Sequence, residues 1–218
     1  SHFLRLKIKQ SLYTPHARYY AGYCYYCAKD FPSALAEFLA VEQLGGYQQI
    51  APYYIIQIEY AQGEYEKVYE RANHLLETFP DNKNNYELHR MLGEMYYQDS
   101  AYVDAIHHLE TYRAKRSEQK KDILRNDIYL LGMANYYTRN YQAAIDNLKQ
   151  VKQLQDSISE NTCLHLGHSY LRVNDLEKAK LNVLRSYPYM SEFIEKSLEE
   201  NQLDINETIE LSKNTYLD

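Results

Sequence analysis

A pattern of small and aromatic residues returns five times along this chain of 218 residues. In its full form a copy has a small residue followed by tyrosine three or four positions on, and then an aromatic or leucine with a small residue three positions after it. The first residues of the copies are Gly22, Ile56, Gly93, Gly132 and Gly167, which lie 34, 37, 39 and 35 residues apart. A period near 34 residues predicts stacked pairs of antiparallel helices.

The composition favours helices throughout. The chain has 7 glycines and 5 prolines, and 45% of its residues are hydrophobic, so it can bury a sizeable core without disulfides or metals. In the first copy Thr14 and Pro15 open a helix that should extend through Ala28, and a second helix is expected over 32–44 before Gly45-Gly46 ends it. Later copies repeat this plan, with a new helix expected near Asn85.

Glycine recurs at the middle of the first helix in the copies other than the second. A glycine inside a helix costs about 1 kcal/mol relative to alanine, so its return at equivalent places predicts close approach of the partner helix. The complementary small surface is expected at alanines of the second helices, namely Ala34, Ala105, Ala144 and Ala179. Ile56 and Val68 replace the small pair in the second copy, and that hairpin should be splayed or shifted.

This arrangement resembles the tetratricopeptide repeat (TPR) family, in which a small residue and an aromatic on helix A face an alanine and a large apolar residue on helix B. The matching residues are Gly22, Tyr25, Ala34 and Phe38; Gly93, Tyr96, Ala105 and Leu109; Gly132, Tyr136, Ala144 and Leu148; and Gly167, Tyr170, Ala179 and Val183. The chain departs from the family in lacking tryptophan near the start of helix A, and its closing proline appears only as Pro80.

The resemblance implies an all-α TPR solenoid, a right-handed α-α superhelix of about five hairpins over residues 14–187. Residues 1–13 are expected to form an N-terminal capping or truncated repeat helix, because Phe3, Leu4, Ile8 and Leu12 have helical spacing. Residues 188–218 lose the repeat phase and are expected to form C-terminal capping helices. Within the family, the tyrosine-rich helices are most similar to bacterial cell-envelope TPR proteins.

Tyrosine is abundant, at 25 residues, and many of these residues occupy positions that should face the inner wall of a TPR superhelix. A tyrosine ring offers a large rigid apolar surface and a hydroxyl, which suits it to partner docking. The alternative is that the rings mainly fill space between neighbouring A helices. The predicted partner-binding residues are Tyr19, Tyr23, Tyr26, Tyr53, Gln57, Tyr60, Arg90, Glu94, Tyr97, Tyr129, Tyr136, Tyr137 and His168.

Motifs for catalysis or cofactors are weak. Cys24 and Cys27 have the spacing of a redox motif, but they lie mid-helix among tyrosines, so we expect buried structural thiols. His165 and His168 lack the added carboxylate of a zinc site, and no glycine-rich phosphate loop or nucleophile elbow occurs. The sequence therefore predicts a protein that is not an enzyme and binds no cofactor or metal, with a solenoid enzyme as the less favoured alternative.

The expected partner is a protein or peptide segment. A net charge of −6 disfavours nucleic acid, and the sequence has no apolar run long enough to span a membrane. The chain begins with Ser1, which suggests a piece of something longer; the expected location is the periplasm or cell envelope, with the cytoplasm as the alternative. A second hypothesis makes the chain a sensory or oligomerisation module of a longer regulator. Self-association through a terminal helix face is also expected to be possible.

Overall fold

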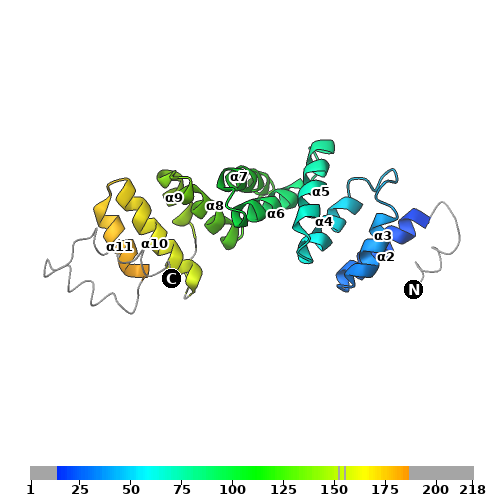
Figure 1. Ribbon diagram of the computed structural model, residues 1–218, viewed down its shortest axis with the longest axis horizontal. Helices are drawn as coiled ribbons and strands as arrows, with labels where there is room; N and C mark the ends of the chain where they lie inside the picture. Colours follow the sequence, from blue (N-terminus) through cyan, green and yellow to red (C-terminus); the bar gives the residue numbers. More distant parts are fainter. Residues whose placement is uncertain (1–13, 152, 155, 187–218) are drawn as a thin grey trace. The chain divides into compact units, whose positions relative to one another are not determined.

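The computed structural model describes residues 14–151, 153, 154 and 156–186, and the regular secondary structure in these ranges is entirely helical (Figure 1). The predicted all-α fold is therefore confirmed. The predicted capping helices at 1–13 and 188–218 lie outside the described residues. In the described ranges, no helix combines the length and apolar character needed to cross a membrane.

The helices of the described residues form five consecutive A and B pairs, each pair joined by a short turn. The pairs are α2 (Thr14–Cys27) and α3 (Phe31–Leu39), α4 (Ala51–Ala61) and α5 (Tyr65–Thr78), α6 (Asn85–Gln98) and α7 (Tyr102–Glu118), α8 (Arg125–Tyr137) and α9 (Tyr141–Leu148), and α10 (Ser157–Arg172) and α11 (Leu176–Ser186). The beginning of α6 at Asn85 agrees with the position expected from the sequence.

The chain divides into two compact units, Ser1–Met95 and Tyr96–Asp218. The first unit contains the helices α2 to α5 and α6 as far as Met95. The second contains the last residues of α6 and the helices α7 to α11. In Figure 1 the members of a pair lie side by side, as for α2 with α3 and for α10 with α11.

The turn inside every pair has the same backbone geometry. Its left-handed residue is Lys29, Gly63, Ser100, Arg139 or Asn174, with φ values of 58°, 75°, 60°, 62° and 62°. In the second pair the Gly63 N–H donates to the Tyr60 carbonyl at 3.1 Å, and the Glu64 N–H donates to the Glu59 carbonyl at 2.9 Å. These two hydrogen bonds satisfy carbonyl groups at the end of helix A, and the turn reverses the direction of the chain. The next helix then begins two residues after the left-handed residue.

Glycine in helix A admits the large apolar side chain of helix B. A Cβ added at Gly132 would lie 2.6 Å from the Leu148 side chain, and one at Gly167 would lie 2.6 Å from Cγ2 of Val183. Gly22 faces the Phe38 ring, where the corresponding separation would be 3.1 Å. The predicted close approach is confirmed, but the side chain against each glycine is the large residue of helix B and not the alanine four positions earlier.

The second pair distributes its volume differently. Ile56 occupies the position of the glycine, and Val68 and Ala72 occupy the positions that hold alanine and a large residue elsewhere. All three are fully buried. In this pair the large side chain of the contact thus belongs to helix A and the small one to helix B, so the space between the two helices is still filled. The expected splaying of this hairpin stays a prediction.

The core of the first unit lies between α2, α3 and α4. Its buried members are Ala34, Phe38, Val41, Ala51, Ile55 and Ile58, and half-buried tyrosines pack around them. Two clusters lie among the described residues of the second unit. Leu109 of α7 packs with Leu130 and Leu131 of α8 in one, and Met133, Ile145, Leu148, Val151 and Leu166 form the other.

The first B helix is shorter than the sequence predicted. α3 ends at Leu39, whereas the expected helix ran to residue 44. From there to Ile50 the chain makes tight turns, with N–H groups bonded to carbonyls three residues earlier, as from Leu44 to Val41 and from Tyr47 to Leu44. This path keeps Val41 in the core and lets the Tyr47 ring pack 5.5 Å from the Tyr19 ring. Tertiary packing of these two side chains explains the early helix end.

Candidate partner-binding faces

The predicted tyrosines of α2 gather around one ring that the sequence analysis did not select. The Tyr54 ring lies 6.2, 5.7 and 5.3 Å from the rings of Tyr19, Tyr23 and Tyr26. It also stacks on Phe38 at 5.0 Å, with an angle of 8° between the planes. Tyr54 therefore connects the predicted inner face of α2 to the core. It was missed because it lies one position away from the inner stripe of α4, beside the predicted Tyr53.

Two hydroxyl groups in the first unit bind the helix pair that follows. Tyr26 Oη donates to Oε1 of Gln57 at 2.5 Å, and Tyr60 Oη donates to Oε2 of Glu94 at 2.6 Å. Both bonds join residues from the predicted set. The tyrosines thus fix neighbouring A helices to one another, which the sequence analysis had weighed as the alternative to partner docking.

The charged members of the set form a small network on α6. Arg90 Nε donates to Oε1 of Glu87 at 2.7 Å, and Arg90 Nη1 donates to Oε2 of Glu94 at 3.2 Å. Burial, followed by the charge of Glu87, raises the pKa of Tyr53. Burial and the bond to Glu94 raise the pKa of Tyr60. Both phenols are therefore neutral donors, and this part of the face carries one more negative than positive charge.

In the second unit the predicted rings of Tyr97 and Tyr137 meet a third tyrosine. Their centroids are 6.4 Å apart, and Tyr102 at the start of α7 stacks on Tyr137 at 4.6 Å and lies 5.6 Å from Tyr97. The predicted Tyr129 is half-buried against the two clusters named above. Burial, followed by the Tyr137 phenol, raises the pKa of Tyr129. Tyr102 was missed because it belongs to a B helix.

Tyr136 and His168 also lie together. The Tyr136 hydroxyl is 3.4 Å from Nδ1 of His168, and the His165 ring meets the Tyr136 ring edge-on at 4.7 Å. Burial lowers the pKa of His165, which favours its neutral form. His168 is only 6% exposed. A partner would therefore approach this position mainly through the tyrosine.

The exposed members of the predicted set are few. Tyr23 is 42% exposed and Tyr137 is 45% exposed, whereas Tyr19, Tyr26, Tyr53 and Tyr60 are half-buried. The structure thus brings the predicted residues together within each unit and leaves ring edges accessible on α2 and α8. Partner binding by these residues stays a prediction.

The expectation for the thiols of α2 is wrong. Cys24 and Cys27 are both exposed, whereas Cys163 of α10 is buried. The sequence placed the pair among tyrosines and inferred burial from those neighbours. The α2 residues that are buried are Ala17, Ala21 and Gly22, whereas the two cysteines lie in the last turn of the helix, beyond the last buried residue. Adjacent aromatic residues in sequence therefore did not indicate whether the thiols are covered.

No family model matches the chain, and no curated protein matches it. Among solved structures, that of MamA (AMB-1) is similar over 80% of this chain and 90% of its own, with 17% identity and a TM-score of 0.61. A mutant of MamA is similar over 87% of this chain and 94% of its own, with 17% identity and a TM-score of 0.59. MamA is an all-helical repeat protein, and the likeness supports a TPR-type solenoid fold for this chain.

Proposed function

We propose that this chain is a non-catalytic scaffold that binds a segment of another protein on the tyrosine-rich faces of its A helices. The proposal rests on the way in which the tyrosine rings of the first unit are held in place. The hydroxyls of Tyr26 and Tyr60 are bonded to the next helix pair, and the Tyr23 ring is held against Tyr54 with 42% of its surface exposed.

Rings that are already held in place suit the capture of a flexible partner. Binding costs about 0.5 to 1.5 kcal/mol for each flexible side chain that must be immobilised, and ordered tyrosines avoid most of this cost. Stacked aromatic surface then contributes affinity through burial of the partner's apolar groups. Similarity to a TPR-type fold supports a binding role over a catalytic one.

The charges near these rings suggest the chemistry of the segment. In the first unit, Glu87 and Glu94 share Arg90, which leaves one negative charge in excess beside Tyr53 and Tyr60. A segment with apolar side chains and at least one basic residue would complement such a face. We propose a partner segment of this kind.

Site-specific photocrosslinking in the native cell tests the role of these faces. A benzophenone side chain would replace Tyr23 or Tyr137, the two exposed members of the predicted set. Matched control positions are Tyr65 and Val103 on α5 and α7, which are 44% and 71% exposed and lie outside the set. Crosslinks to a defined partner segment at the first two positions and not at the controls support the proposal. Equal crosslinking at all four positions contradicts it.

We further propose that the assembly served is in the bacterial cell envelope, on the basis of the tyrosine-rich helices that resemble envelope TPR proteins. Fractionation of cells tests this directly, because recovery in the cytoplasm contradicts it. The alternative, a sensory or oligomerisation module of a longer regulator, predicts an adjoining output domain in the full gene. Self-association, favoured by the exposed Leu176 and Leu181 of α11, predicts a mass that rises with concentration in light scattering.

A further inference from the structure

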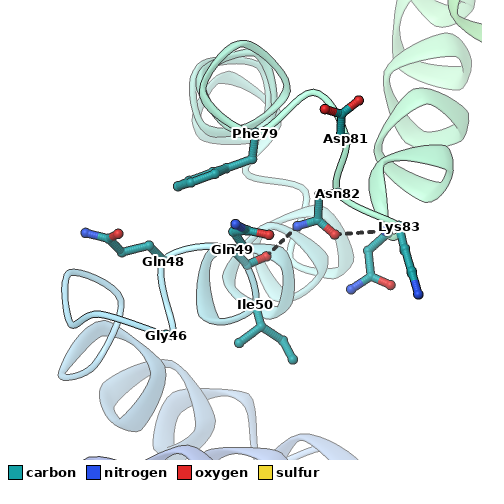
Figure 2. Close-up of a pocket in the computed structure, with 9 residues that line it drawn as sticks. Gly46, Gln48, Gln49, Ile50, Phe79, Asp81, Asn82 and Lys83 are labelled. Carbon is teal, nitrogen blue, oxygen red and sulfur yellow. Dashed lines mark hydrogen bonds between the residues drawn. The ribbon is translucent and has the colours of Figure 1, made fainter.

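An open cavity with polar and apolar lining residues lies between two connections of the first unit (Figure 2). One connection joins α3 to α4 and the other joins α5 to α6. The cavity has a volume of about 620 Å³, which is in the range of sites for small molecules. The residues that line it are Gly46, Gln48, Gln49, Ile50, Phe79, Asp81, Asn82, Lys83 and Asn84.

The walls of this cavity are fixed by amide side chains. Asn82 Nδ2 donates to the Gln49 carbonyl at 2.9 Å, and the Asn84 N–H donates to Oδ1 of Asn82 at 3.0 Å, as the dashed lines of Figure 2 show. Asn85 Nδ2 donates to the carbonyls of Phe79 and Pro80 at 2.8 and 3.0 Å. Two connections that are 33 residues apart in sequence are thus held together before any ligand arrives.

Several polar groups around the cavity are uncommitted. Within the part of the chain that the structure describes, the side chains of Gln49, Asp81, Lys83 and Asn84 make no hydrogen bond and no ion pair. Gln48 donates only to the Gln43 carbonyl, at 3.3 Å. The hydroxyls of Tyr26 and Tyr60, by contrast, are already bonded. Groups that are free to meet a ligand therefore gather at this cavity.

The chemistry of the lining selects a neutral ligand with many hydroxyls. Side-chain amides both donate and accept, and a carboxylate accepts at two oxygens, so these planar groups can each bind adjacent hydroxyls. The Phe79 ring extends along one side of the cavity in Figure 2 and can cover the C–H face of a sugar ring. The charges of Asp81 and Lys83 cancel, so neither an anion nor a cation is favoured. We propose that this cavity binds a neutral carbohydrate of about one or two sugar units.

A smaller neighbouring cavity would extend the site. Its volume is about 210 Å³, and it shares Gln48 and Phe79 with the first cavity. Arg71 lines it, with Nη1 bonded to Glu42 at 3.0 Å and Nε bonded to Glu59 at 3.0 Å. This arginine is neutralised by two carboxylates, which again disfavours an anionic ligand. A longer oligosaccharide can therefore contact both cavities, which share Phe79.

A ¹H–¹⁵N NMR titration of the whole chain tests the proposal. The probes are cellobiose, maltose, lactose and N,N′-diacetylchitobiose, each raised to about 20 mM, which would largely fill a site of millimolar affinity. We expect at least one to give saturable shifts at the backbone amides of Gln48, Gln49 and Asn84. No saturable shift with any of the four would overturn the proposal, as would a stronger response there to a neutral Gly-Ser peptide.

A double variant separates binding from folding. Gln49 and Asn84 contribute main-chain atoms to the bonds with Asn82, so the changes Gln49→Ala and Asn84→Ala keep those bonds and remove two free amides. The variant should bind the responding sugar at least about tenfold more weakly, equivalent to about 1.4 kcal/mol. Gln98→Ala, at an exposed amide outside the cavity, is the matched control. Unchanged affinity in the double variant would contradict the assignment.

Discussion

Tyr60 and Glu94 lie 34 residues apart, and the tyrosine hydroxyl donates a 2.6 Å hydrogen bond to Oε2 of the glutamate. The separation is close to one repeat of the sequence pattern, and Tyr26 with Gln57 and Tyr136 with His168 recur at 31 and 32 residues. The same tyrosine position thus reaches a polar group of the next helix pair in three cases. In the helix pair that contains Tyr136, the position equivalent to Gln57, Glu94 and His168 is occupied by Met133, whose side chain offers no strong acceptor.

The bond from Tyr60 to Glu94 should contribute measurably to stability. Tyr60→Phe removes only the hydroxyl, and a hydrogen bond to a charged acceptor contributes about 1.5 to 3 kcal/mol. We expect urea unfolding of the first unit at a lower concentration. Tyr65→Phe, on a 44% exposed ring of α5, is the matched control and should change the free energy of unfolding by less than about 0.5 kcal/mol. An unchanged midpoint for Tyr60→Phe would show that the bond is not stabilising.

Alanine should be harmful at the mid-helix glycines although it is the better helix former. At Gly132 and Gly167 the new Cβ would lie 2.6 Å from the side chains of Leu148 and Val183. Overpacking of this kind costs about 1 to 3 kcal/mol, which exceeds the gain of about 1 kcal/mol in helix propensity. Thermal unfolding of Gly132→Ala and Gly167→Ala checks this. Gly45→Ala, with no atom within 4 Å of the new Cβ, should leave stability unchanged or slightly raised.

In the turns between helices A and B, replacement of a residue by glycine should be stabilising. Ser100 and Arg139 adopt left-handed backbone conformations at φ of 60° and 62°. A non-glycine residue there costs about 1 kcal/mol, so Ser100→Gly and Arg139→Gly should raise the free energy of unfolding. Gly63→Ala should lower it, because Gly63 has a φ of 75°. Urea unfolding of the three variants gives the sign of each effect, and destabilisation by both glycine substitutions would refute the steric argument.

Stability should decline on mild acidification because of His108. Burial, followed by the charge of His107, lowers the pKa of His108 from 6.5 to about 4. The unfolded chain therefore takes up this proton first as the pH falls, and the free energy of unfolding decreases between about pH 6.5 and 4. Below about pH 4 this histidine adds no further loss. Burial lowers the pKa of His165 too, and its contribution has the same sign.

The variant His108→Phe isolates this contribution. A phenyl ring can keep the stacking on Tyr96, whose ring lies 5.3 Å from that of His108, but it cannot be protonated. Chemical unfolding at several pH values should give a shallower decline between pH 6.5 and 4 than in the unchanged protein. Parallel curves would mean that His108 does not titrate with a lowered pKa in the folded state.

The exposed cysteines and the Tyr54 ring show where sequence patterns stop being informative. Cys24 and Cys27 have tyrosines beside them in sequence, yet both are exposed in the last turn of α2, beyond its last buried residue, Gly22. Tyr54 differs from the predicted Tyr53 by one position, a rotation of roughly 100° around the helix, and that rotation turns it toward Phe38. An error of one position in the assumed inner stripe therefore changes which ring is expected to meet the core.

The repeat, the all-helical fold and the glycine positions where helix B approaches closely could all be predicted from the amino-acid sequence. These follow from local periodicity and from the volume of single residues, such as Gly132 opposite Leu148. The partners of the tyrosine hydroxyls, the early end of α3 at Leu39 and the cavity beside Phe79 became visible only in the folded chain. Those features depend on side chains one repeat apart and on the paths of two connections, and neither is encoded in a periodic pattern along one helix.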